Sequence, residues 1–165
     1  MSHLRVCRIA ATMALSLVSV AAVAATTTAT FQVSATVAAA CTVSASPMNF
    51  GSFSSLTSVV DTTTSVTVNC VSGTTWLAGI DLGTGAGASL ASRKLTGGAN
   101  ILDYNIFRDA ARTQVMGGFV TGGNVLGGTG TGLNDVQTLY GRIPANATTP
   151  PAGTYTDLIT VTVQF

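Results

Sequence analysis

Apolar and polar residues alternate with a period of two along most of the chain, and no stretch shows the period of an amphipathic helix. Val, Thr and Ile fill the alternating runs, and Gly, Asn, Asp and Ser interrupt them, as in short strands joined by turns. We therefore expect an antiparallel β-sandwich. The runs predict strands at Cys41–Phe50, Ser65–Val71, Trp76–Leu82, Ile101–Arg108, Thr113–Met116, Val136–Ile143 and Tyr155–Phe165.

The segment Thr26–Val37 alternates in the same way but precedes the first predicted strand of the domain. One face carries only apolar residues, the other carries Thr, Ser and Gln, and the segment has no charge. Two interpretations remain open on this pattern. The segment is either the first strand of its own sandwich or an extension whose apolar face fits another molecule. The apolar face consists of Ala29, Phe31, Val33, Ala35 and Val37.

Residues 1–25 have the features of a secretory signal peptide. Arg5 and Arg8 form a basic head, and Ile9–Val23 is an apolar run that is short for a membrane span. Small residues at Ala22 and Ala24 match a cleavage pattern. We expect a secreted protein whose domain begins after this leader.

Composition narrows the possible functions. Charged residues make up 8% of the chain, against about 25% in ordinary soluble domains. Beyond the leader, five bases stand against six aspartates, so neither nucleic acid nor an anionic membrane is an expected partner. Such a sparse charge suggests a surface hidden in an assembly.

Two cysteines, Cys41 and Cys70, remain after the leader is removed. An even pair in an exported protein predicts a disulfide bond, because the compartments outside the cytoplasm are oxidising. Both cysteines lie on the apolar side of alternating runs. The expected bridge therefore joins two strands at the core.

Candidate catalytic chemistry is sparse. Without the leader there is no histidine to act as a general base, and Gly127–Gly132 lacks the Lys-Ser/Thr that a phosphate loop needs. The aspartates lie at predicted outward or loop positions, and the aromatic residues within strands are expected to pack in the core. We expect no enzyme activity, cofactor, metal or small-molecule substrate. A surface ion-pair cluster is expected among Arg108, Arg112, Asp103 and Asp109.

Several short motifs resemble the spore coat protein U domain family, which includes the pilins of archaic chaperone–usher pili. The resemblance covers the chain beyond the leader and rests on motifs in a fixed order around the two cysteines. These motifs are Asn49–Gly51, Val66–Cys70, Tyr104–Thr113 and Pro151–Phe165, together with the alternating N-terminal run.

The resemblance implies an immunoglobulin-like sandwich that lacks its final strand. Residues 26–40 would then be a donor-strand extension, with Phe31, Val33, Ala35 and Val37 as the inserting side chains, and residues 41–165 the pilin domain. Strand addition would fill the gap in each subunit. A periplasmic chaperone would first bind the edge formed by Ile159, Val161, Val163 and Phe165.

The same resemblance implies an outer-membrane usher and neighbouring copies of the chain as partners. It places the protein in a fimbrium on the cell surface, with a role in adhesion or biofilm formation. Two alternatives remain. The chain is a minor or tip-proximal adhesive subunit, or it is a spore-coat or other secreted surface-layer protein.

Overall fold

The computed structural model describes residues 23–146 and 149–165, and the expected signal peptide lies almost entirely outside these ranges. Residues 23–36 form a unit separate from residues 37–165, and the eight strands of the described chain all belong to the second unit. The strands are β1 (Cys41–Ala45), β2 (Val60–Cys70), β3 (Thr75–Ile80), β4 (Arg93–Gly97), β5 (Asn100–Phe107), β6 (Leu126–Thr129), β7 (Asn134–Ile143) and β8 (Val161–Gln164).

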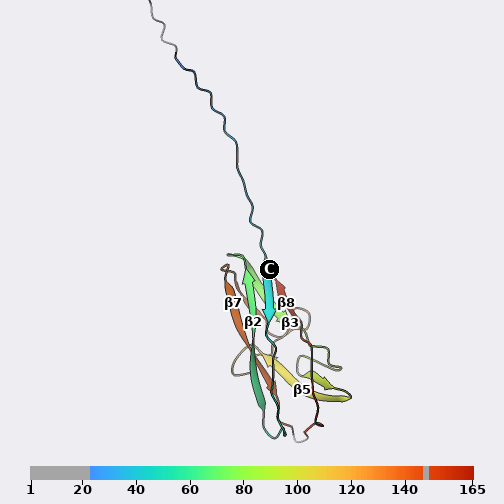
Figure 1. Cartoon of the computed structure of the whole chain (residues 1–165). Coiled ribbons are helices and arrows are strands. Elements are labelled where there is room, and N and C mark those ends of the chain that lie inside the picture. The colour runs from blue at the N-terminus through green and yellow to red at the C-terminus, as the bar shows by residue number, and fades with distance from the viewer. Residues whose placement is uncertain (1–22, 147–148) are drawn as a thin grey trace, which may run out of the picture. The chain divides into compact units, whose positions relative to one another are not determined.

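The domain is an antiparallel sandwich of two sheets, as predicted (Figure 1). A five-stranded sheet has the order β1-β2-β7-β5-β4, and a three-stranded sheet has the order β6-β3-β8. The chain before β8 forms a bridge from Thr156 to Thr96 on β4 and then crosses to the other sheet. At one side of the sandwich, the edge strand β1 of the first sheet lies beside the edge strand β8 of the second.

The core lies between the sheets and follows the period-two pattern of the strands. On β2, alternate residues from Val66 to Cys70 are buried, whereas the residues between them remain partly exposed. Trp76, Ala78 and Ile80 of β3 face them from the other sheet. On β1 and β2, most outward positions carry threonine or serine, whose hydroxyl groups are hydrated without a charge.

The predicted strands match the structure in place but not in length. Four strands, β2, β3, β5 and β7, begin before their predicted starts, while β1 and β8 are much shorter than predicted. The strand expected at Thr113–Met116 is wrong, because that segment makes only isolated bridges from Val115 and Met116. Two strands, β4 and β6, were not predicted.

The expected ion-pair cluster is also wrong. Asp103 pairs with Lys94 across β4 and β5, and Arg112 pairs with Asp61. Asp109 instead accepts hydrogen bonds from the backbone of Thr113 and Gln114 and stabilises the turn after β5. Arg108 donates to the carbonyl oxygen of Val125.

Arg93 is a fully buried cation that the sequence did not single out. Its guanidinium group donates to the carbonyl oxygens of Asp81 and Met116 and to Oδ1 of Asn105. Burial lowers the pKa of Arg93 from its usual value, but these acceptors satisfy its donors. Arg93 thereby joins the end of β3 to β4, β5 and the loop at Met116.

Candidate assembly groove

The facing edges of β1 and β8 have no ladder between them. In the described chain β1 pairs only with β2, and β8 pairs only with β3. Their outer N–H and C=O groups are therefore free to accept another strand. An unpaired edge of this kind is a template for strand addition, and proteins usually shield it.

On the inner face of β1, Val43 and Ala45 are exposed and Cys41 is half-buried, although all three point toward the core. Cys41, Val43 and Ala45 share a face with their partners on β2, which are buried. The opposite wall carries Val161 and Val163 of β8, which are half-buried against Ile80 and Ala78 of β3. We call the unpaired edges of β1 and β8, together with these apolar side chains, the assembly groove.

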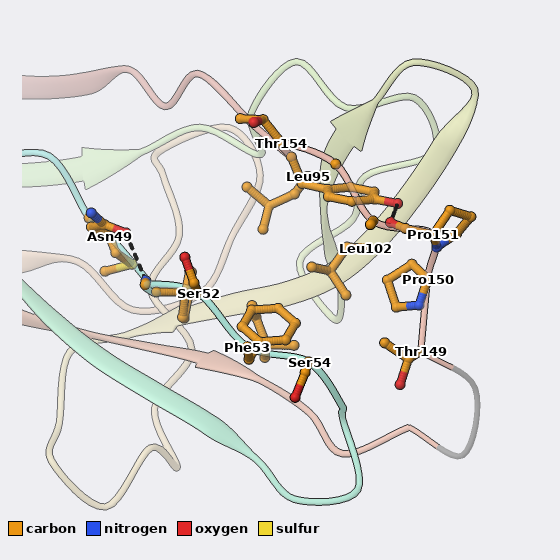
Figure 2. A pocket seen from close by; sticks show the side chains of 17 residues that line it. Asn49, Ser52, Phe53, Ser54, Leu95, Leu102, Thr149, Pro150, Pro151 and Thr154 are labelled. Atoms are coloured by element: carbon orange, nitrogen blue, oxygen red, sulfur yellow. Dashed lines mark hydrogen bonds between the residues drawn. The ribbon is translucent and has the colours of Figure 1, made fainter.

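A pocket of about 670 Å³ lies beyond the end of β1 and before the start of β8. One side of the pocket consists of residues 48–54, the other of residues 149–155, and its base includes Leu95, Leu102 and Ile143 (Figure 2). The hydroxyl group of Tyr155 donates to the carbonyl oxygen of Pro151 and fixes the second side. The pocket therefore lies at the end of the domain where β1 ends and β8 begins.

Gly141 on β7 makes room for the first side of this pocket. A Cβ atom at this position would lie 2.5 Å from Sδ of Met48 and 2.9 Å from the ring of Phe50. The absent side chain lets the segment after β1 pack directly against the sheet. Phe50 then meets the Tyr104 ring edge-on, with ring centroids 6.0 Å apart.

Two aspartates hold the segment that precedes β8. Asp81 Oδ1 accepts a hydrogen bond from the Thr160 amide, at 3.0 Å. Asp157 accepts hydrogen bonds from the Tyr104 hydroxyl, at 2.7 Å, and from the Thr84 amide and hydroxyl. Burial, reinforced by the hydrogen bond to Asp157, raises the pKa of Tyr104 well above its usual value. The segment thus keeps its place without a continuous ladder.

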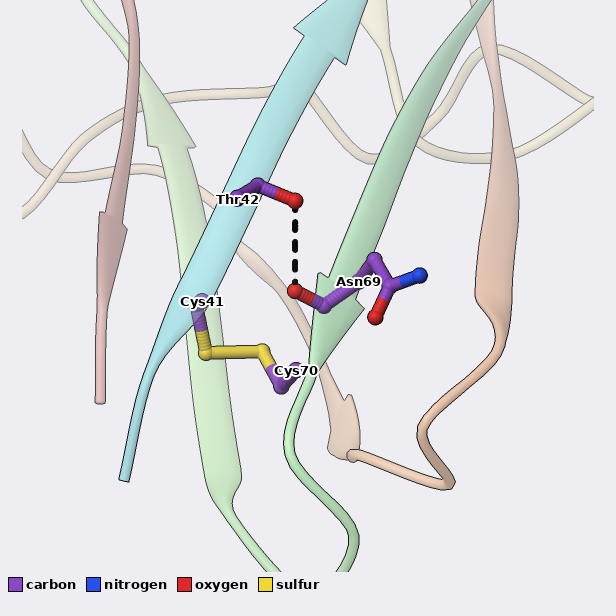
Figure 3. The surroundings of a disulfide bond; sticks show 4 residues. All are labelled: Cys41, Thr42, Asn69 and Cys70. Carbon is purple, nitrogen blue, oxygen red and sulfur yellow. Dashed lines mark hydrogen bonds between the residues drawn. A yellow bond between two sulfur atoms is a disulfide. The ribbon is translucent and has the colours of Figure 1, made fainter. Parts of the chain in front are cut away.

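The disulfide bond predicted between Cys41 and Cys70 lies at the other end of the groove (Figure 3). The two residues are direct partners in the β1–β2 ladder, with Cα atoms 4.1 Å apart. A hydrogen bond from Thr42 to the carbonyl oxygen of Asn69 lies beside them. The bridge fastens the short β1 wall to the central part of the sheet.

The proposed inserting residues lie in a segment without secondary structure. Residues 23–40 form no strand or helix, and Phe31, Val33 and Val37 are each more than 80% exposed. Within the described chain the segment makes no ladder with its own domain. The four residues of the predicted chaperone edge differ in burial. Ile159, Val161 and Val163 pack partly against the core, whereas Phe165 is exposed.

Sequence reasoning missed the pocket and the residues that hold its sides. Phe50 and the Pro150–Tyr155 segment come from opposite ends of the sequence, and no local pattern shows that they face each other. The missed β4 supplies Leu95 to the pocket. The clearest available signal is the motif Pro151–Asp157, whose last residues, from Tyr155, the sequence pattern assigns to a strand.

Two kinds of feature are absent from the residues that the structure describes. They contain no group of three or more His, Cys, Asp or Glu side chains that could hold a metal ion. They also contain no helix long and apolar enough to cross a membrane. The assembly groove has unpaired backbone groups and apolar side chains, and both can bind an added β-strand.

Comparison with known families identifies the fold. Residues 27–162 match the Spore Coat Protein U domain, so the chain belongs to this family. The match spans the exposed N-terminal segment and nearly all of the sandwich. A search of curated proteins finds no matching relative.

One similar solved structure is the CsuC–CsuE chaperone–tip adhesion subunit pre-assembly complex from archaic chaperone–usher Csu pili of Acinetobacter baumannii. The TM-score is 0.58 at 19% sequence identity. The match covers 79% of this chain and only 41% of that chain. At this level of identity, the similarity concerns the sandwich fold alone.

Proposed function

We propose that this protein is a structural subunit of a surface pilus, and that its subunits join by inserting the N-terminal segment of one copy into the assembly groove of the next. The observation that carries the proposal is a complementary pair of features in one chain. No strand of the described chain lies between β1 and β8, and residues 26–37 form an alternating segment that makes no ladder with the described residues. Strand addition of this kind combines main-chain hydrogen bonds with separate pockets for alternate side chains.

The spacing of the inserting residues suits the groove. Phe31, Val33, Ala35 and Val37 lie on one side of an extended chain, about 6.6 Å apart, because each residue advances about 3.3 Å. The polar residues between them would face outward beside the Thr and Ser side chains of the sheets. The exposed Val43 on β1 and Phe165 beyond β8 would become covered.

Fibre geometry favours insertion antiparallel to β8. The start of β1 and the end of β8 lie at the same end of the domain (Figure 1). An inserted strand antiparallel to β8 leaves the groove at the opposite end, so the next domain follows in line. Insertion parallel to β8 would bring the two domains together at their Cys41 ends, and a linear fibre could not continue.

The same geometry opposes insertion into the subunit's own groove in that direction. From Val37 to Cys41 the extended chain can span at most about 14 Å. The 11 residues of β2 extend for roughly 36 Å. The donor segment would end at the far end of the groove, beyond the reach of this linker from Cys41. This difference in length supports a second chain as the proposed partner.

The proposal includes a chaperone and an usher. The groove exposes apolar surface in an unassembled subunit. A periplasmic chaperone would bind the β8 edge, at half-buried Ile159, Val161 and Val163 and exposed Phe165. The usher would then receive the subunit at the outer membrane, and the finished fibre would lie on the cell surface. A structural role of this kind needs no catalytic residue.

The substitution Val33→Asp tests the proposal against a matched control, Thr30→Asp. Burying an unpaired carboxylate in a groove pocket costs several kcal/mol, whereas Thr30 would face outward. Val33→Asp should abolish heat-resistant ladders on gels and fibres in electron micrographs, while the subunit keeps its disulfide bond and its chaperone. Thr30→Asp should assemble nearly normally.

Two results would contradict the proposal. Fibres that survive Val33→Asp would mean that this face does not enter a groove. A monomer that unfolds through Val33→Asp alone would mean that the segment belongs to its own sandwich. The protein would then be a self-contained secreted sandwich.

A further inference from the structure

The sandwich has a second unpaired edge, on β7, away from the assembly groove. The strand β5 pairs with β7 only at Tyr140, Gly141 and Arg142. The remaining part of β7, Asn134–Leu139, has ladder partners only on β2 within the described chain. In Figure 1, β5 accordingly lies beside only one end of β7.

The two edges offer similar backbone but different side chains. At the groove, the inward positions of β1 and β8 carry Cys, Val and Ala without a charge. On β7, Asp135 is the direct partner of Val68 and Gln137 is the direct partner of Val66. Directly opposite residues lie on the same face of a sheet, and both valines are buried. Asp135 and Gln137 therefore point inward, toward the space between the sheets.

These two polar side chains are partly buried and bind each other. Gln137 Nε2 donates to Asp135 Oδ1. Further along β7, the inward residues Leu139 and Ile143 are apolar and buried. The polar pair thus lies in the part of β7 that has no ladder with β5. Arg108, just after the end of β5, donates to the Val125 carbonyl oxygen beside β6. Charged groups thus accompany this opening and are absent from both strands of the groove.

An inward-pointing charge on an edge strand is a known protection against strand addition, because an added strand would cover the carboxylate without pairing it. We propose that Asp135 prevents the N-terminal strand of another copy from adding to the free edge of β7. Strand addition is then confined to the assembly groove, and each subunit accepts one neighbour. This inference rests on the proposed function.

Fibres of the full chain carrying Asp135→Val test this role. The probe is a synthetic peptide of residues 26–40 with a gold label, counted along fibres by electron microscopy. On unaltered fibres the label should sit only at one end, where a groove is open. On Asp135→Val fibres it should also line the shaft, and bound peptide per subunit should rise at least about tenfold.

Two control variants separate this effect from others. Thr138→Val adds an apolar side chain to the outer face of the same strand segment, and Asp103→Val removes a carboxylate from β5. Both should leave the shaft unlabelled. Asp135→Asn keeps the size of the side chain and should give intermediate labelling, and it takes over the test if Asp135→Val does not fold.

The outcomes also separate this inference from the proposed function. If fibres form and label at one end, but the shafts of Asp135→Val and Asp135→Asn stay as bare as the unaltered shaft, Asp135 has no such role. Equal shaft labelling of the control variants would overturn it as well. If the unaltered chain forms no fibres, the proposed function fails, and this inference fails with it.

Discussion

Val43 and Val68 stand directly opposite each other on the inner face of the β1–β2 ladder, yet Val43 is 39% exposed and Val68 is 1% exposed. The difference arises because β2 lies between two strands, whereas β1 has a neighbour on only one side. A strand beside β1 would cover Val43 as β1 covers Val68. The pair therefore marks where the sandwich is incomplete.

We expect Val43→Asp to block assembly while leaving the monomer folded. In the free subunit the carboxylate can stay hydrated at this exposed position, so the free energy of unfolding should change by less than about 1 kcal/mol. An inserted strand would bury it at a cost of several kcal/mol. Thermal unfolding of the monomer and a peptide-binding titration with residues 26–40 measure the two effects.

The matched control for this variant is Ser44→Asp, one residue further along β1. Ser44 lies on the outer face, opposite Thr67, so its carboxylate would stay in water after insertion. It should bind the peptide nearly as well as the unaltered chain. Equal binding by both variants would show that the inserted strand does not cover the inner face of β1.

Loss of the disulfide bond should destabilise the domain strongly. Cys41 and Cys70 are separated by 29 positions, and closing a loop of this size contributes about 3–4 kcal/mol in the chain-entropy account. Replacing both cysteines with serine should lower Tm by roughly 10 °C. Thr42→Ala is a control, because it changes a neighbouring side chain without opening the loop, and calorimetry should find it nearly neutral.

The ion pairs of Asp61 should make stability depend on acid. Hydrogen bonds from Arg142, aided by the charges of Arg112 and Arg142, hold the pKa of Asp61 below its usual value of 3.8. The stabilisation is therefore fully present above about pH 4 and is lost as pH falls through the lower pKa of the folded state. Asp61→Asn should lower Tm at pH 7, and the difference should shrink toward pH 2.

Thr63→Asn, on the same exposed face of β2, is the control for Asp61→Asn. Its effect on Tm should not vary with pH in this range. A Tm difference for Asp61→Asn that stays constant from pH 7 to about pH 2 would mean that the arginines contribute nothing through their charge.

Removal of Thr162–Phe165 should leave little soluble protein in the periplasm. The deletion takes away half-buried Val163 and the strand that pairs with Leu77–Gly79. The three-stranded sheet would lose one wall of the groove and the proposed chaperone edge together. Cell fractionation and chaperone co-purification measure the loss, and unchanged values for both would contradict the proposal.

Much of the sandwich could be predicted from the sequence because its inner faces alternate plainly. The strands β2, β3, β5 and β7 follow runs such as Val66–Cys70, in which burial and pattern agree. The strands β4 and β6 could not be predicted in this way, since one contains Arg93 and Lys94 and the other contains two glycines. Pairing with β5 and β3 decides their structure, and such pairing is not local.

The assembly groove could not be predicted from the alternation of apolar and polar residues either. Alternation indicates which face of a strand is buried, but it does not show which edge lacks a partner. Asp135 illustrates this limit, because its predicted outward or loop position proved to be an inward position on β7. Only the register with Val68 reveals its orientation.

Lys94 gives the protein an unusual experimental property. It is the sole lysine of the chain, and it lies on β4, separated from β1 by three strands of the same sheet. An amine-reactive dye would therefore attach at one side chain per subunit, besides the amino terminus, without touching β1 or β8. A polymer built as proposed would carry one side-chain fluorophore at every repeat, and energy transfer between neighbouring dyes would report its extension under load.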